Sequence, residues 1–252
     1  MKIGVCIKQV PASDSRIKIN AEQTGIVTDE IKWEMNPYDE FALEAALQLK
    51  EAGQATEVVL LTVGGADCEA RIRGDGLARG ADGAIRLDGP GFEGADALGV
   101  ARLLAAAIQK AEIGLVFCGK QAIDNDTSQL PPMLAETLGW PQAMVVSELS
   151  LEGETLTVHR AAGGGNRMVL QMDLPAVVST DKGLNTPRFA SLKGIMMAKR
   201  AQVNVIAAAA PAASVTVVSQ SPPPAKPAGK KYEGGDSATE VASLLRDEAN
   251  VI

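Results

Sequence analysis

One segment sets the architecture of this chain: it runs Ile113-Gly114-Leu115-Val116-Phe117-Cys118 and continues as Gly119-Lys120-Gln121-Ala122-Ile123-Asp124-Asn125-Asp126-Thr127-Ser128-Gln129. The first part is a short apolar run, typical of a buried strand, and the second part is polar. Residues 130–138 then predict a helix. A buried strand that ends in small and polar residues before a helix is where α/β proteins bind ligands. The free amides of such a helix start would face an anion.

The same alternation of strands and helices extends through the first half of the chain. We expect strands at 1–8, 57–63, 84–87 and 113–118, and helices at 38–51, 67–79, 95–110 and 130–138. Residues 15–34 are expected to form a hairpin around Thr24-Gly25 or, alternatively, an irregular excursion. This order predicts an α/β fold in which a doubly wound, mostly parallel sheet carries helices on both faces.

The pattern changes after Pro141. We expect an antiparallel extension made of strands at 143–150, 154–160 and 167–173, and then one more buried strand at 174–180. A polar loop, a short helix near 192–200 and a strand at 203–206 follow. Residues 207–235 are rich in Ala, Pro, Ser and Gly and cannot fold alone, whereas residues 236–249 predict a helix. We therefore divide the chain into an α/β domain, residues 1–206, and an arm, residues 207–252. The arm ends in a helix that docks on another protein or, alternatively, is a frayed tail.

Composition excludes several classes of function. The net charge of −7 argues against nucleic acid, because neutralising phosphates requires clustered Lys and Arg. No apolar run approaches the ~20 residues of a membrane-spanning helix, and the start of the chain predicts a strand, not a signal sequence. We expect Cys6, Cys68 and Cys118 to be buried thiols in a reducing compartment, without a metal. A single histidine, His159, expected on an outward strand position, leaves the chemistry to a cofactor and predicts no catalytic residue.

The polar segment 119–129 can hold a nucleotide only through its backbone. Asp124 and Asp126 repel phosphate, so the amides and hydroxyls of residues 125–130 must bind it, since the two prolines that follow have no N–H. The aspartates would then cap the helix or accept hydrogen bonds from ribose. Lys120 either adds positive charge or is solvated. The alternative reading of the whole segment is a plain capped helix.

A second candidate segment is Asn36-Pro37-Tyr38-Asp39, which begins the helix at 38–51 after an irregular entry. Its irregular backbone could contact an adenine ring. The alternative is an asparagine cap followed by a proline in the first helical turn.

Taken together, these motifs resemble the β subunit of electron transfer flavoprotein. The matches, in chain order, are Val5-Cys6-Ile7-Lys8-Gln9-Val10-Pro11, Met35-Asn36-Pro37-Tyr38-Asp39-Glu40, the segment 119–129, Gly139-Trp140-Pro141-Gln142, and a stretch from Leu184 to Lys199 that contains Pro187-Arg188-Phe189-Ala190 and Leu192. The last helix also resembles the closing helix of the family. Several separate matches in one order are more specific than any single short motif.

The resemblance implies a Rossmann-like, adenine-nucleotide-binding fold and a place in a heterodimer. An α subunit would hold most of one FAD, while this chain would bind a structural AMP and close over the flavin. The heterodimer would shuttle electrons from dehydrogenases, such as the acyl-CoA dehydrogenases of fatty acid β-oxidation, through a quinone oxidoreductase toward the quinone pool. The chain would be an electron carrier and not an enzyme, in the bacterial cytoplasm or, alternatively, the mitochondrial matrix.

The resemblance also implies which residues bind. The AMP contacts would be Cys6, Asn36, Pro37, Tyr38, Asp39, Val63, Gly119, Lys120, Gln121, Ala122, Ile123, Asp124, Asn125, Asp126, Thr127, Ser128, Gln129 and Leu130. The stretch from about Thr180 to Arg200 would recognise dehydrogenases, with Leu192 as its apolar anchor. The alternative for Leu192 is that it packs its own short helix.

Two other functions stay open. One is an electron-bifurcating form with a second FAD in place of AMP. Relatives of that kind commonly have glycine between the two aspartates, where this chain has Asn125, which favours AMP. The other is a stand-alone adenine-nucleotide-binding module or adenylyl-transfer enzyme of the same fold. The helix-tipped arm and the lack of a Lys/Arg cluster directed at phosphate argue against it.

Overall fold

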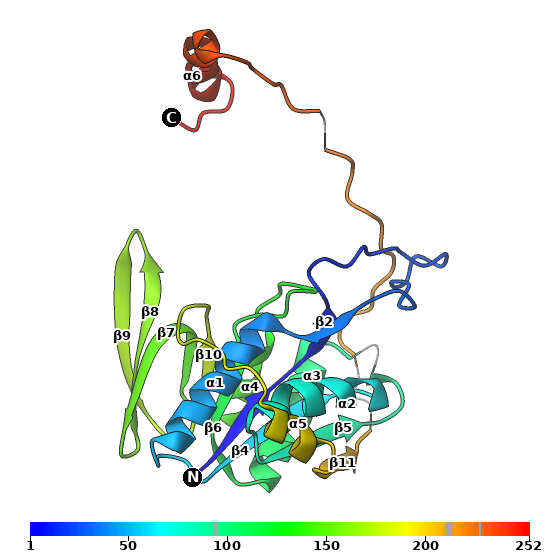
Figure 1. Ribbon diagram of the computed structural model, residues 1–252, viewed down its shortest axis with the longest axis vertical. Coiled ribbons are helices and arrows are strands. Elements are labelled where there is room, and N and C mark those ends of the chain that lie inside the picture. Colours follow the sequence, from blue (N-terminus) through cyan, green and yellow to red (C-terminus); the bar gives the residue numbers. More distant parts are fainter. Residues whose placement is uncertain (93–94, 210–212, 227) are drawn as a thin grey trace.

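The structure is a computed structural model that describes residues 1–92, 95–209, 213–226 and 228–252. Its centre is a nine-stranded sheet in the order β11-β5-β4-β1-β6-β10-β7-β8-β9 (Figure 1). The strands that pair in parallel are β1 (Lys2–Cys6), β4 (Glu57–Val63), β5 (Gly83–Asp88), β6 (Ile113–Gly119), β10 (Ala176–Thr180) and β11 (Val203–Ala207). The antiparallel extension consists of β7 (Gln142–Glu152), β8 (Thr155–Gly163) and β9 (Asn166–Asp173), and β7 joins β10 in parallel. The predicted doubly wound α/β fold with an antiparallel extension is thus confirmed.

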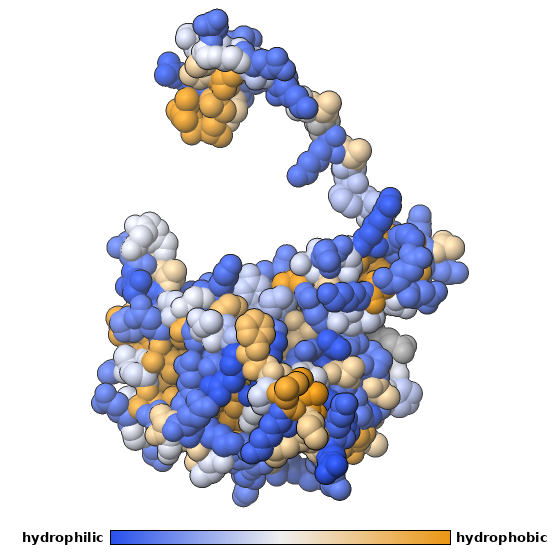
Figure 2. All heavy atoms as spheres, viewed as in Figure 1, coloured by the Kyte–Doolittle hydropathy of each residue, from blue (hydrophilic) through white to orange (hydrophobic). Residues whose placement is uncertain are grey.

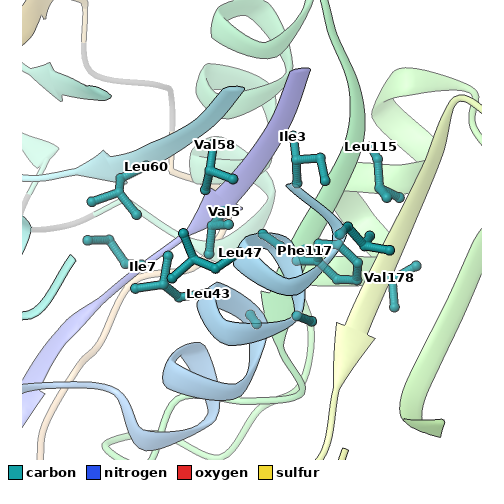
Figure 3. Close-up of a cluster of buried hydrophobic side chains, with 14 of the residues drawn as sticks. Ile3, Val5, Ile7, Leu43, Leu47, Val58, Leu60, Leu115, Phe117 and Val178 are labelled. Carbon is teal, nitrogen blue, oxygen red and sulfur yellow. The ribbon is translucent and has the colours of Figure 1, made fainter. Parts of the chain in front are cut away.

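Helices cover both faces of the sheet, because successive strand residues point to opposite sides. Helix α1 (Pro37–Glu51) packs on one face, where Leu43 lies in the same cluster as Leu60 and Phe117 (Figure 3). Helices α3 (Ala97–Lys110) and α4 (Leu130–Leu138) cover the other face, where Leu61 belongs to a second cluster. Each fully buried side chain of this size contributes roughly 1.5–3 kcal/mol relative to an exposed one.

The helix predicted at 67–79 is wrong as a single element. The chain there forms four short pieces: η1 (Ala66–Cys68), α2 (Glu69–Arg71), a π-helical segment η2 (Ile72–Gly76) and η3 (Leu77–Arg79). Glycine is a poor helix former, and this stretch contains two. At Gly76 a Cβ atom would lie 2.2 Å from Cδ1 of Leu60. The segment therefore presses closely onto β4, and this contact overrides regular helix geometry.

The excursion after β1 contains a small ribbon that the sequence analysis did not predict. Strands β2 (Gln9–Pro11) and β3 (Trp33–Met35) pair antiparallel, and three residues are too few to show a strand pattern. Between them the expected hairpin around Thr24-Gly25 is confirmed by an Ile19–Ile26 bridge.

The last part of the chain leaves the domain. After α5 (Leu192–Ala198) and β11, an extended arm leads through η5 (Gly235–Ser237) to α6 (Ala238–Asp247), which stands apart from the sheet in Figure 1. Between the end of β11 at Ala207 and the start of η5 at Gly235, the described residues form no helix or strand, and residues 210–212 and 227 lie outside the described part. Across the part of the chain that the structure describes, no helix has the length and apolarity to cross a membrane.

Candidate functional site

A cavity of about 330 Å³ opens at the carboxyl ends of the central strands. The chain leaves β1 toward β4 on one side and later returns to β6 on the other, so the cavity lies where the strand order reverses. Such a switch point is the usual ligand site of an open α/β sheet. Cys6 and Cys118 line it from β1 and β6, and Val63 lines it from β4.

The cavity brings together part of the predicted site. The predicted residues that line it are Cys6, Asp39, Val63, Gly119, Gln121, Asn125, Thr127, Ser128, Gln129 and Leu130. The remaining predicted residues, which are not among the lining, are Asn36, Pro37, Tyr38, Lys120, Ala122, Ile123, Asp124 and Asp126. Several of these hold the loop that follows β6.

Asn36 connects the start of α1 to that loop. It occupies the N-cap position of α1, but its side chain makes no capping hydrogen bond. Its Nδ2 instead donates to Asp39 Oδ1 at 2.8 Å and to the carbonyl oxygen of Gln121 at 2.9 Å, while its Oδ1 accepts from the amide of Ile123 at 3.2 Å. With 1% of its surface exposed, Asn36 is a buried support and not an accessible adenine contact.

Asp39 continues this support at the edge of the cavity. Its carboxylate accepts the amides of Lys8 at 2.8 Å and Gly119 at 3.1 Å. Burial raises the pKa of Asp39 to about 7, against the opposing effect of these hydrogen bonds and that of Asn36. Gly119 is required here, since a Cβ at this position would lie 2.4 Å from Asp39 Oδ1.

The raised pKa of Asp39 makes stability depend on pH. Between about pH 4 and 7 the folded chain retains this proton while the unfolded chain loses it, so the free energy of unfolding falls as pH rises, by at most about 1.4 kcal/mol per pH unit. We expect the unfolding free energy of the wild type, taken relative to that of Asp39→Asn, to fall from pH 5 to 7 and to level off above pH 8. Denaturant titrations at several pH values measure it. A difference independent of pH would contradict the assignment.

The two aspartates of the loop both bond other side chains of the protein. Asp124 forms an ion pair with Lys8 Nζ at 2.6 Å, and Asp126 accepts a hydrogen bond from Gln121 Nε2, also at 2.6 Å. Neither caps α4, so the capping alternative is wrong, while acceptance of hydrogen bonds from ribose stays a prediction. Asp126 and Ser128 both have left-handed backbones, with φ of 50° and 54°. Such strain in non-glycine residues clusters at ligand sites.

Lys120 contacts Asp181 and Tyr38 instead of lining the cavity. Its Nζ lies 2.8 Å from Asp181 Oδ1 and 4.8 Å from the centre of the Tyr38 ring. The hydrogen bond and charge of Asp181 raise the pKa of this ammonium despite partial burial. The lysine is therefore neither simply solvated nor part of the cavity lining.

The start of α4 has the amides that an anion needs. No side chain caps this helix, which contradicts the alternative of a plain capped helix. In the described residues, the amides of Ser128 and Gln129 have no acceptor from the protein. Both residues line the cavity, and the helix dipole adds partial positive charge there.

Most of the apolar wall of the cavity was not predicted from the sequence. The lining residues that were not predicted are Ile7, Lys8, Leu61, Thr62, Phe92, Ala95, Ala97, Val100, Leu104, Cys118 and Pro131. Thr62 could have been found, because it precedes Val63 at the end of a predicted strand. The α3 side chains carry no signal of their own beyond ordinary helix periodicity.

The remaining candidate groups from the sequence are the cysteines, His159 and Leu192. The three cysteines are free and buried, as predicted. Within the described ranges, no cluster of His, Cys, Asp and Glu could hold a metal. His159 lies on β8, with Nδ1 3.5 Å from Glu148 Oε2. Leu192 is 84% exposed, so the alternative that it packs its own helix is wrong.

The fold and the cavity define a Rossmann-like α/β protein with a cavity at the switch point of its sheet. A family model described as electron transfer flavoprotein domain matches residues 24–211. The chain is 39% identical to electron transfer flavoprotein subunit beta of Bradyrhizobium diazoefficiens over 100% of both chains. It is 40% identical to the human subunit beta over 92% of this chain and 93% of that one, and 36% identical to the mitochondrial subunit beta of Arabidopsis thaliana over 100% of both. The chain belongs to the electron transfer flavoprotein family, as a β subunit.

Proposed function

We propose that this chain binds AMP in the cavity and, with an α subunit that holds most of one FAD, forms a heterodimeric electron carrier. The carrier takes electrons from flavin dehydrogenases, such as acyl-CoA dehydrogenases, and passes them through a quinone oxidoreductase toward the quinone pool. The proposed location is the bacterial cytoplasm or, alternatively, the mitochondrial matrix, since a bacterial and a mitochondrial relative both match over their full lengths. The flavin supplies the redox chemistry, and AMP is structural, stabilising the folded state by mass action.

The uncapped start of α4 beside the cavity carries this proposal. The amides of Ser128 and Gln129 point to a phosphate at this position, while the apolar wall, which includes Val63 and Val100, suits an adenine ring. The volume of about 330 Å³ is at the small end of the ~300–1,000 Å³ range for ligand sites. This favours a mononucleotide over a second FAD.

The arm and the loop near α5 would provide the two protein contacts. Helix α6 carries Val241, Leu244 and Leu245 on one side, next to Tyr232, and no residue of α6 is buried. We propose that the arm, residues 207–252, docks this helix on the α subunit, while residues 1–206 form the nucleotide-binding domain. The stretch Thr180 to Arg200 recognises dehydrogenases through Leu192.

Ligand stoichiometry tests the proposal. The chain is co-expressed with an α subunit, and the purified complex is extracted with acid. One FAD and one AMP per heterodimer are expected. Two FAD would support the bifurcating form instead. A colourless monomer that hydrolyses ATP would overturn the electron-carrier function.

Leu192→Ala tests the docking role. Removing an exposed apolar anchor weakens the binding of the carrier to a dehydrogenase. We therefore expect the KM for the carrier to rise about fivefold or more, with bound flavin unchanged. The measurement is steady-state reduction of the heterodimer by a reduced dehydrogenase. The control is Val205→Ala, which truncates an exposed apolar side chain on β11 (45% exposed). Equal kinetics for the two variants would remove Leu192 from this role.

A further inference from the structure

An exposed apolar surface lies on α5 and the segment just before it. Phe189 is 94% exposed, Leu192 84% and Met196 67%, although all three are large apolar side chains. Figure 2 shows hydrophobic residues gathered at this place, on the face that also carries α1. We call Phe189, Leu192 and Met196 the apolar platform. These three side chains bury little apolar surface in the chain itself, so contacts made by neighbouring residues must fix their position.

The segment between β10 and α5 has no regular hydrogen bonding, but it is fastened by Arg188. The Nε atom of Arg188 lies 2.8 Å from Glu44 Oε2, and its Nη2 lies 3.0 Å from Glu44 Oε1. The same guanidinium bonds Glu51 one to two turns further along α1, with Nη2 2.9 Å from Oε2 and Nη1 on Oε1. One side chain thus ties the segment to α1 at two points, and Phe189 follows it directly in the chain.

The partner on α1 is unusual, because Glu44 has a side chain only 6% exposed. Burial opposes ionisation, yet the hydrogen bonds from Arg188 hold the pKa of this carboxyl below its ordinary value. Glu44 Oε2 also accepts the backbone amide of Arg188 at 3.2 Å. A buried carboxylate can be kept only if it is fully paired. Replacing a buried ion pair by apolar residues of similar size is often neutral or stabilising. Stability alone therefore does not account for the pair of Glu44 and Arg188.

Three further contacts hold the same segment and α5. Asn185 Nδ2 donates to the carbonyl of Phe41 on α1 at 3.0 Å. Arg73 of η2 donates to the carbonyls of Ala198 and Ala201 at 3.0 and 2.7 Å, at the end of α5. At Gly194 a Cβ would lie 2.1 Å from the carbonyl oxygen of Ala78, so α5 rests directly on η3. The platform is therefore exposed but held on a rigid base.

We propose that Arg188 is a positioning residue, whose clamp on Glu44 and Glu51 holds the apolar platform in the conformation that enters an apolar pocket of the dehydrogenase. This rests on the proposed docking function. A clamped segment loses little conformational entropy when the partner binds, so part of its affinity comes from preorganisation. Arg188 itself is one third exposed and directed toward α1, and it acts through Phe189 and Leu192.

Two variants in the heterodimer test this. Arg188→Lys keeps a positive charge beside Glu44 but loses the planar fork that reaches both carboxylates. Arg188→Met combined with Glu44→Gln removes both charges, so no unpaired buried carboxylate threatens folding. The control is Lys50→Met, which removes a cation and its ion pair with Asp82 from the end of the same helix without touching the segment.

Two readouts separate this inference from the proposed function. Hydrogen exchange of the amides of residues 181–191 reports the clamp, and KM and kcat with a reduced dehydrogenase report docking. In both variants we expect exchange and KM to rise roughly tenfold, with kcat, bound FAD and dithionite reduction unchanged, and Lys50→Met to match the wild type. In a double-variant cycle, Leu192→Ala should add less than its full effect to Arg188→Lys.

The other outcomes are decisive. Unchanged exchange in both variants would overturn the clamp, whatever the kinetics. Faster exchange with an unchanged KM would overturn the link between clamp and docking. If Leu192→Ala then also left KM unchanged, the proposed docking function itself would fail.

Discussion

Gly119→Ala is expected to lower the free energy of unfolding by about 1–3 kcal/mol and to release AMP from the heterodimer. The added Cβ would lie 2.4 Å from Asp39 Oδ1, 2.7 Å from Tyr38 Cβ and 2.8 Å from the Tyr38 carbonyl carbon. Asp39 Oδ1 ends a side chain, but the carboxylate is held by the amides of Lys8 and Gly119 and by Asn36, and the two Tyr38 atoms lie on or next to the backbone. The end of β6 must therefore move away from α1, and the cavity lining moves with it.

Gly114 provides a matched control on the same strand. A Cβ at Gly114 would meet only Met1 Cβ, at 3.9 Å, which is an ordinary contact. Gly114→Ala should keep its AMP and unfold within about 0.5 kcal/mol of the wild type. Denaturant unfolding and AMP content are measured for both variants. Equal behaviour of the two would show that the close approach at Gly119 does not shape the site.

The second large effect is expected for Asn36→Ala. The substitution leaves the amide of Ile123 and the carbonyl of Gln121, both partly buried, without their partner, and it removes a donor from the buried Asp39. Unsatisfied buried groups cost about 1–3 kcal/mol each, so we expect a loss of about 3 kcal/mol in unfolding free energy. The loop after β6 should also lose its order, and AMP affinity should fall with it.

Two comparisons make the Asn36 test specific. Asn20→Ala likewise removes an asparagine side chain that bonds the backbone, here as acceptor of the amides of Thr24 and Gly25, but at an exposed to partly buried turn, so it should cost less than 1 kcal/mol. Asn36→Asp keeps the acceptor for the amide of Ile123 but places a second carboxylate next to that of Asp39. It should therefore not restore the unfolding free energy of the wild type. Thermal unfolding of the heterodimers with and without added AMP measures all three. Full stability of Asn36→Ala would remove the support role.

The sheet was predictable from sequence because its strands are buried on both faces. Runs such as those at 58–61 and 113–118 are apolar throughout, and the strand–helix alternation predicts the rest of the doubly wound fold. The segment at 67–79 was not predictable in the same way. Its hydrophobic spacing is helical, and besides its two glycines the broken helix reflects the close contact of Gly76 with Leu60, which exists only in the folded chain.

The site was predictable in its position but not in its details. Polar residues at the end of a buried strand located the loop, yet nothing local distinguishes Ser128, which lines the cavity, from Asp126, which bonds Gln121. The clamp of Arg188 on Glu44 joins residues 144 positions apart. Such long-range pairs depend on how α1 and the segment after β10 pack, which a single sequence does not reveal.

The most direct test of the account is a crystal structure of the heterodimer purified without added nucleotide. We expect electron density for one mononucleotide between the ends of β4 and β6, with its phosphate on the amides of Ser128 and Gln129 and the flavin elsewhere. Side chains filling that cavity, or a second flavin in it, would contradict the account.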